Sequence, residues 1–110
     1  MERFVKGDVV VLEFPYSDSL KTKKRPSLVV ANLKGDNLIL CQITGQPRPD
    51  PDLIGLKKDD FQTGSLHRDS FIMPSFLFTI NKLKINYLAG KINPEKIKEV
   101  ENKLCEIFTR

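Results

Sequence analysis

Runs of β-branched and apolar residues, each the length of one strand and bounded by turn formers, most constrain the fold of this chain. Residues 8–14 read DVVVLEF and are closed by Pro15, as is typical of a buried strand. Residues 25–31 and 38–44 form two further runs of this kind, and residues 35–37 supply turn chemistry between them. Three strands in sequence predict an antiparallel meander.

Two polar segments interrupt this pattern. Residues 15–24 contain turn formers without a sustained period, so we expect a mobile hairpin loop there. Residues 47–51 read PRPDP, and each proline fixes its own φ and favours an extended conformation in the residue before it. A helix is therefore not expected at 47–51.

The second half of the chain continues the β pattern less regularly. We expect a short strand at 52–56 and then a connecting loop or a single helical turn at 57–68. Residues 70–80 predict a strand interrupted at Pro74. Proline has no backbone N–H to donate to a neighbouring strand, so it is best placed at a bulge or a sheet edge. Residues 83–92 predict the last strand.

One amphipathic helix is expected to close the chain. Asn93 is a good N-cap, Pro94 suits the first helical position, and apolar residues then recur mostly at intervals of three and four. The predicted fold class is therefore mainly β with a C-terminal α-helix, built as a small, strongly curved sheet or a partly closed antiparallel barrel. A chain of 110 residues is expected to form a single domain over 1–110.

The N-terminal sequence and the cysteines indicate in which cellular compartment the protein is expected. No signal peptide or transit peptide is recognisable, and no apolar run is long enough to span a membrane, so the expected location is the cytoplasm. Cys41 and Cys105 lack the local spacing of a zinc site or a redox motif. We therefore expect two buried free thiols and no metal site.

The charge of the chain favours an anionic partner. Its 18 Lys and Arg residues exceed its 14 Asp and Glu residues, which gives a net charge of +4. Part of this excess is concentrated in the basic run Lys21, Lys23, Lys24 and Arg25. Such a run is a candidate surface for phosphates, and it is equally typical of an ordinary solvated loop.

Arg25 and Thr44 are the candidates for chemistry. Arg25 stands where the basic loop is predicted to pass into a strand, so a rigid element would hold its guanidinium while its donors stay available. Thr44 ends the third predicted strand, and in a meander that end lies near the start of the second. The two side chains are therefore expected to face one pocket and to suit a phosphodiester, although a lone Arg or Thr is often structural.

Six short motifs follow one another along the chain: GDVV at 7–10, FPYSD at 14–18, KRPSLVV at 24–30, QIT at 42–44, LFTI at 77–80 and LAGKI at 88–92. Their order and spacing resemble those of the MazF/PemK-like toxin endoribonucleases of type II toxin-antitoxin systems. The resemblance implies an SH3-like barrel that forms a homodimer and cleaves single-stranded RNA through 2′-hydroxyl attack. It also implies that no metal or other cofactor is used and that a cognate antitoxin protein inhibits the activity.

The same resemblance assigns roles to residues of this chain. Arg25 would bind and stabilise the scissile phosphate, and Thr44 would help to position it. The loop carrying Lys21, Lys23 and Lys24 would follow RNA phosphates, which makes binding salt-dependent.

Other polar residues are weaker candidates. Gln46 and Arg48 have the chemistry to hydrogen-bond bases splayed from a single strand, although polar loop residues need no such role. His67 lies in a polar loop between Leu66 and Arg68. We expect it to be solvated rather than to act as a general base.

Met73 and Ser75 depart from the family pattern. Many members carry an arginine before the matching proline or an acidic residue after it, and this chain has neither. Either cleavage uses a smaller set of residues, or the activity has been lost and the barrel is a module that binds RNA or a partner protein. A third interpretation is a pure protein-interaction domain whose basic loop docks an acidic peptide.

Overall fold

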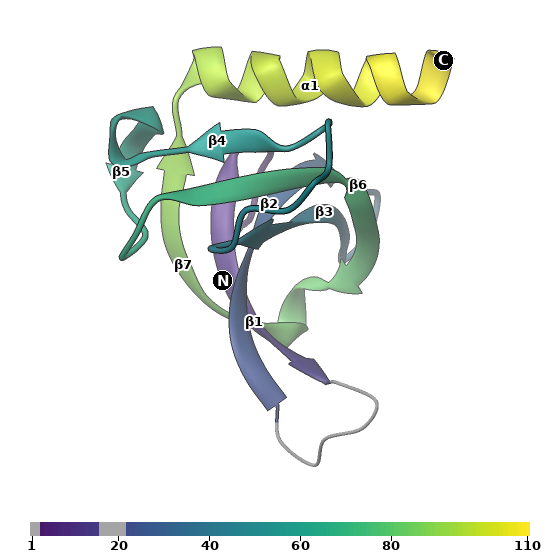
Figure 1. Ribbon diagram of the computed structural model, residues 1–110. Coiled ribbons are helices and arrows are strands. Elements are labelled where there is room, and N and C mark those ends of the chain that lie inside the picture. The colour runs from purple at the N-terminus through teal and green to yellow at the C-terminus, as the bar shows by residue number, and fades with distance from the viewer. Residues whose placement is uncertain (1–2, 16–21) are drawn as a thin grey trace.

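The computed structural model describes residues 3–15 and 22–110. The strands are β1 (Asp8–Pro15), β2 (Thr22–Asn32), β3 (Asn37–Thr44), β4 (Ile54–Leu56), β5 (Phe61–Gly64), β6 (Ser70–Asn81) and β7 (Ile85–Ile92) (Figure 1). Two short 3-10 turns, η1 (Lys58–Asp60) and η2 (Lys82–Lys84), and one helix, α1 (Pro94–Thr109), complete the regular structure of this part of the chain.

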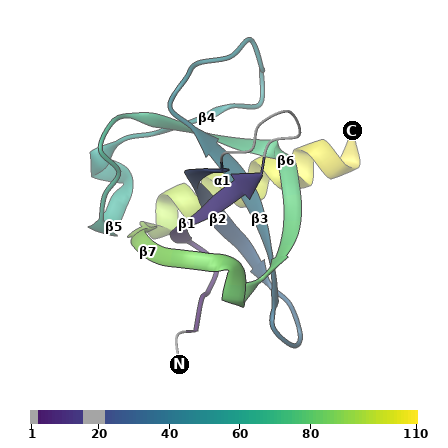
Figure 2. The same ribbon diagram turned by 90° about the horizontal axis from the view of Figure 1, so that it is seen from below.

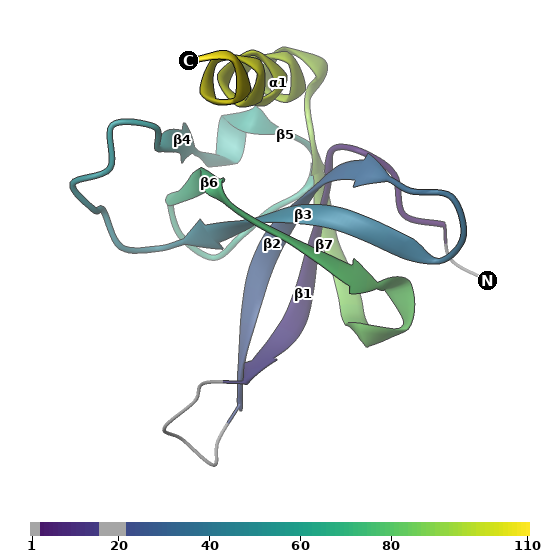
Figure 3. The same cartoon turned by 90° about the vertical axis from the view of Figure 1, so that its right-hand side faces the viewer.

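All seven strands belong to one antiparallel sheet, in the order β4-β6-β3-β2-β1-β7-β5. The sheet curls, so that β6 and β7 lie on either side of β1, β2 and β3 in Figure 2. α1 lies across one end of the curl, and the β1–β2 hairpin extends away from it at the other end (Figure 3). The predicted fold class, a partly closed antiparallel barrel with a C-terminal helix, is confirmed.

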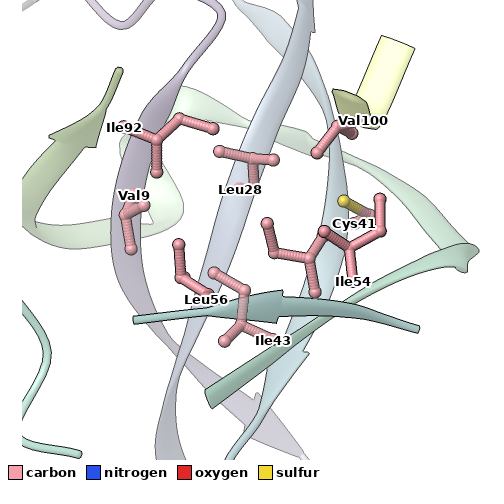
Figure 4. Packing of buried hydrophobic residues seen from close by; sticks show 9 residues of the cluster. Val9, Leu28, Cys41, Ile43, Ile54, Leu56, Ile92 and Val100 are labelled. Atoms are coloured by element: carbon pink, nitrogen blue, oxygen red, sulfur yellow. The ribbon is translucent and has the colours of Figure 1, made fainter. Parts of the chain in front are cut away.

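Strand β1 is buried on both faces, which explains its unbroken apolar run. Val9 packs with Leu28 in one hydrophobic cluster, which α1 closes through Val100 (Figure 4). Val10 and Leu12 belong to a second cluster on the other side of the strand. Each of these side chains contributes about 1.5–3 kcal/mol by leaving water. Hydrophobic packing on both faces therefore stabilises the centre of the sheet.

Pro74 lies at a bulge, as predicted. The register between β3 and β6 steps from Cys41 opposite Leu77 to Gln42 opposite Met73. The residues of β6 between these two pairs are extra, and the proline, which has no N–H to donate, stands among them. The sheet bends at this point without losing the pairing on either side.

The helix begins where its sequence predicts. The side chain of Asn93 accepts a hydrogen bond from the backbone N–H of Lys96 at 2.8 Å, and Pro94 occupies the first turn. At the other end, the Arg110 guanidinium lies 2.6 Å from Asp52 Oδ1. The helix is thereby attached to the segment between β3 and β4.

The start of β2 differs from the prediction. This strand begins at Thr22 and continues the ladder with β1, so Arg25 lies within it, opposite Leu12. Arg25 therefore does not stand at a boundary between loop and strand, because cross-strand pairing extends the strand further than its apolar residues do. Residues 16–21 of the predicted hairpin loop, and with them Lys21, lie outside the described residues.

The segment predicted as a loop or a single helical turn contains both a turn, η1, and an additional strand, β5. β5 pairs with β7, and the two backbones approach closely at Gly64 and Gly90. Gly64 has φ +69°, and a Cβ there would lie 2.2 Å from the carbonyl oxygen of Ala89. The last strand also starts later than predicted, at Ile85, because η2 occupies the preceding residues.

The two cysteines differ in exposure. Cys41 is buried, as predicted, and burial raises the pKa of its thiol to about 12. Cys105 is exposed on α1, so the prediction of a buried thiol was wrong there. In residues 3–15 and 22–110, no helix has both the length and the apolar character needed to cross a membrane.

Candidate active site

An open cavity of about 240 Å³ lies where several distant segments of the chain meet. Strands β1, β2, β3, β6 and β7, the residue after β3 and the loop between β5 and β6 all contribute to its wall. The lining residues are Val11, Arg25, Pro26, Ile43, Gly45, Leu66, His67, Arg68, Ser70 and Tyr87. Two arginines, one histidine and one tyrosine therefore share one concave surface.

Arg25 is held by the β1–β2 ladder, where it pairs with Leu12. Its side chain is half-buried. The next residue, Pro26, also lines the cavity, and the strand continues directly into the buried core. A guanidinium on such a support has little freedom to move when an anion arrives.

Thr44 lies directly behind the cavity wall. It is 5% exposed, and its neighbours Ile43 and Gly45 line the cavity while Thr44 itself does not. Its hydroxyl oxygen accepts a hydrogen bond from the backbone N–H of Gln46 at 3.1 Å. The structure therefore does not bring Thr44 and Arg25 into one pocket, and the hydroxyl instead fixes the turn that follows β3.

Arg68 is a residue that the sequence reasoning missed. Its side chain lies over Gly45, so that a Cβ at position 45 would stand 3.2 Å from its Cδ and 3.3 Å from its Nε. The two residues are 23 positions apart, and no local signal links them. The absence of a side chain at Gly45 leaves room for the exposed Arg68 side chain to lie close to the backbone at that position.

His67 and Tyr87 complete the polar part of the wall. His67 is exposed, as predicted, and it also lines the cavity. Tyr87 is 52% exposed and stands opposite Val11 in the β1–β7 ladder. An exposed aromatic ring beside a cationic surface is suited to stacking on a nucleobase.

The remaining predicted RNA-binding residues lie on the surface outside the cavity. Lys23 and Lys24 are exposed near the start of β2, at the end of the hairpin far from α1 (Figure 3). Gln46 and Arg48 are exposed in the segment after β3. Lys21 lies outside the described residues.

Met73 and Ser75 do not line this cavity. Met73 is 1% exposed and belongs to the interior. Ser75 is exposed, and its hydroxyl lies 3.5 Å from Asp50 Oδ2, the length of a weak hydrogen bond. The uncharged residues at these two positions therefore leave the charge of the cavity unaffected.

Two further observations define what the site offers. Within residues 3–15 and 22–110, no cluster of three or more His, Cys, Asp or Glu side chains is arranged to hold a metal ion. A second cavity, of about 280 Å³, contains Lys82 beside Asp36, with Nζ 3.3 Å from Oδ1. Asp36 is part of that cavity's lining, whereas the lining of the cavity containing Arg25 includes two arginines and no Asp or Glu, so the latter cavity is the better candidate for binding an anion.

A family model described as "PemK-like, MazF-like toxin of type II toxin-antitoxin system" matches residues 5–108. The match runs from the segment before β1 almost to the end of α1, so it includes every element of the cavity wall. Among curated proteins, none matches the sequence significantly.

Three solved structures with the same fold come from mycobacteria. An endoribonuclease in complex with its cognate antitoxin is 16% identical, with a TM-score of 0.73 over 96% of this chain and 95% of that chain. A second mycobacterial endoribonuclease is 17% identical, with a TM-score of 0.71 over 98% and 93%. The Mycobacterium tuberculosis toxin MazF-mt6 is 14% identical, with a TM-score of 0.71 over 92% and 95%. At these identities the likeness establishes a shared fold.

Proposed function

Because the chain belongs to the PemK-like, MazF-like toxins of type II toxin-antitoxin systems, we propose that it is an endoribonuclease that cleaves single-stranded RNA. The observation that carries this proposal is the position of Arg25, half-buried on a paired strand and lining an open cavity. A phosphodiester in that cavity would meet a guanidinium whose direction is already set. The endoribonuclease activity of two structural neighbours agrees with this assignment.

The proposed reaction is an internal transfer at phosphorus. The 2′-oxygen of one nucleotide attacks the adjacent phosphorus and loses its proton, the bond to the 5′-oxygen breaks, and that oxygen gains a proton. Negative charge grows on the non-bridging oxygens in the transition state, and Arg25 would stabilise it there. The nucleophile belongs to the RNA, so the protein needs only to orient the chain, stabilise charge and assist the proton transfers.

The other residues would act around this step. Thr44 positions the turn that carries Gly45 into the cavity wall, which supports an indirect role in place of direct contact with phosphate. Lys23 and Lys24 extend a cationic surface along the β1–β2 hairpin, where a phosphate backbone would run, and we include Lys21 in the same role. The exposed residues Gln46 and Arg48 would contact bases beyond the cavity.

The further parts of the proposal concern partners and location. We propose a homodimer in the cytoplasm that one cognate antitoxin protein inhibits, formed by a single domain over 1–110. One of the structural neighbours is in complex with its own cognate antitoxin, which supports the antitoxin as the partner. Sedimentation of the purified chain tests the dimer directly, because a monomer at micromolar concentration would contradict it.

A non-catalytic module that binds RNA or a protein is the second candidate. It is favoured by the lining of the cavity, which includes no Asp or Glu that could act as a general base. A cavity with two arginines and no catalytic partner would still bind RNA phosphates. Binding without cleavage distinguishes this module from the proposed enzyme.

The decisive experiment is cleavage of a long single-stranded RNA in excess EDTA, with the cut ends mapped. Arg25→Ala should slow cleavage by about 100-fold or more, because one charge-stabilising donor is lost. Arg25→Lys should restore only part of the rate, because it keeps the charge and loses the bidentate geometry. Lys98→Ala, at an exposed position of α1 outside the cavity, is the matched control and should cut as the wild type does.

The stability of these variants decides how the result is read. Arg25 is half-buried, so the alanine variant should stay within about 1 kcal/mol of the wild-type free energy of unfolding. Loss of cleavage together with loss of folding would count against the site. Intact RNA with retained binding by the wild type would favour the non-catalytic module.

A further inference from the structure

We propose that Arg68 is a second phosphate-binding residue of the cavity, and that Gly45 is the surface on which its side chain is seated. The inference rests on the proposed function and adds to it the group that receives the phosphate together with Arg25. The ligand it names is a phosphodiester of single-stranded RNA.

The first argument is position. Arg68 comes from the loop between β5 and β6, and Arg25 comes from β2, yet both line the same cavity of about 240 Å³. A Cβ at position 45 would lie 3.2 Å from the Cδ of Arg68, 3.3 Å from its Nε and 3.5 Å from the Cζ of its guanidinium. Arg68 is exposed, and the absence of a side chain at Gly45 lets these atoms of the arginine lie against the cavity wall.

The second argument is charge. In the described part of the chain, the Arg68 guanidinium has no ion pair and no side-chain hydrogen bond, although Lys6, Lys91, Lys96, Lys103 and Arg110 each have a carboxylate partner. No Asp or Glu is among the residues that line this cavity. A bound anion would give the Arg68 guanidinium the charged partner that no described carboxylate supplies.

The third argument is the shape of the ligand. A phosphodiester has two non-bridging oxygens, and each accepts hydrogen bonds from a guanidinium fork. Arg25 comes from strand β2, and Arg68 comes from the loop between β5 and β6 with its side chain against Gly45, so the two cations reach the cavity from different elements. Such an arrangement orients the phosphate as well as binding it, which a single arginine does less well.

The test combines four variants with the cleavage assay in excess EDTA. Arg68→Ala should slow cleavage at least 10-fold at unchanged cut sites, and Arg68→Lys should recover part of that loss. Gly45→Ala keeps Arg68 and displaces it by a few tenths of an ångström, so it should also slow cleavage, by a smaller factor. The double variant Gly45→Ala with Arg68→Ala should be no slower than Arg68→Ala alone, because the glycine acts through the arginine.

A binding arm separates this inference from the proposed function. The probe is a single-stranded DNA with the sequence of the RNA substrate, which lacks the 2′-hydroxyl, and its affinity is measured from 50 to 300 mM salt. Arg68→Ala should reduce the slope of log affinity against log salt by about 0.7, the value for one phosphate contact on a single strand. Lys98→Ala should cut RNA as the wild type does and is the control for general effects of charge.

Each result supports or overturns the inference. If the wild type cuts RNA and Arg68→Ala cuts equally fast with the same salt slope, the inference fails and the ribonuclease stands. If the wild type binds without cutting and Arg68→Ala lowers the slope, the ribonuclease fails and the phosphate contact stands. Three other results would overturn the inference. The first is a wild type that binds without cutting and has the same salt slope as Arg68→Ala. The others are additive effects of Gly45→Ala and Arg68→Ala on cleavage, and no binding of nucleic acid at all.

Discussion

Met73 shows at the scale of one residue why sequence position alone does not make a site. The resemblance aligned it with a position that is often charged, but its side chain is 1% exposed and packs inside the sheet. A cation there would lose its hydration without gaining a partner, at a cost of several kcal/mol. The cavity instead takes its second arginine from the loop between β5 and β6.

We predict that Met73→Ala lowers the free energy of unfolding by about 2–5 kcal/mol, because it leaves a cavity in a packed interior. Urea unfolding followed by circular dichroism measures this change. Ser75→Ala, at an exposed position, should change the free energy of unfolding by no more than about 0.5 kcal/mol. A stable Met73→Ala variant that does not cut RNA would show that Met73 acts at the site after all.

The buried thiol of Cys41 predicts how stability depends on alkaline pH. Burial raises its pKa from 9.0 to about 12, so the unfolded chain releases this proton at a lower pH than the folded chain does. The contribution to stability is complete below pH 9 and is lost between pH 9 and about 12, by about 1.4 kcal/mol for each pH unit. Urea unfolding at pH 8 and pH 10.5 should therefore show a smaller drop for Cys41→Ala than for the wild type. Cys105→Ser, at an exposed position, should keep the wild-type drop.

At the scale of elements, β5 shows what the sequence does not reveal. Phe61 and Thr63 favour strands, but four residues that end in a glycine are too short a pattern to predict one, and the strand exists because β7 offers a partner at short backbone distance. Gly64 makes that approach possible through φ +69° and the absence of a Cβ. A short strand defined by its partner cannot be recognised before the partner has been placed.

We predict that Gly64→Ala lowers the free energy of unfolding by at least about 2 kcal/mol, since the residue would carry both left-handed strain and a clash with the Ala89 carbonyl. The matched control is Gly55→Ala in β4, where nothing lies within 4 Å of a new Cβ and φ is not left-handed. Urea unfolding measures the difference between the two variants. Hydrogen exchange should show the loss of protection to be largest in β5 and β7, and equal stability of the two variants would contradict this account.

At the scale of the whole molecule, the sequence predicted the features that depend on neighbouring residues and missed those that depend on contacts between distant segments. The meander, the bulge at Pro74 and the cap of α1 at Asn93 follow from neighbouring residues, and all three are confirmed. The cavity combines residues from Val11 to Tyr87, so its composition depends on how the sheet curls. The contact between Gly45 and Arg68 carries no periodicity or spacing from which it could have been inferred.

The order of the sheet has a consequence for association between molecules. Its two outermost strands, β4 and β5, are neighbours in sequence, with only residues 57–60 between them, and they contain three and four residues. Lys96 of α1 holds both ends of this connection, since its Nζ donates to the Gly55 carbonyl at 3.0 Å and lies 3.6 Å from Asp60 Oδ2. An incoming strand from another chain would find only a few unpaired backbone groups at either edge. The shortness of the two edge strands therefore protects the protein from growing into a continuous sheet.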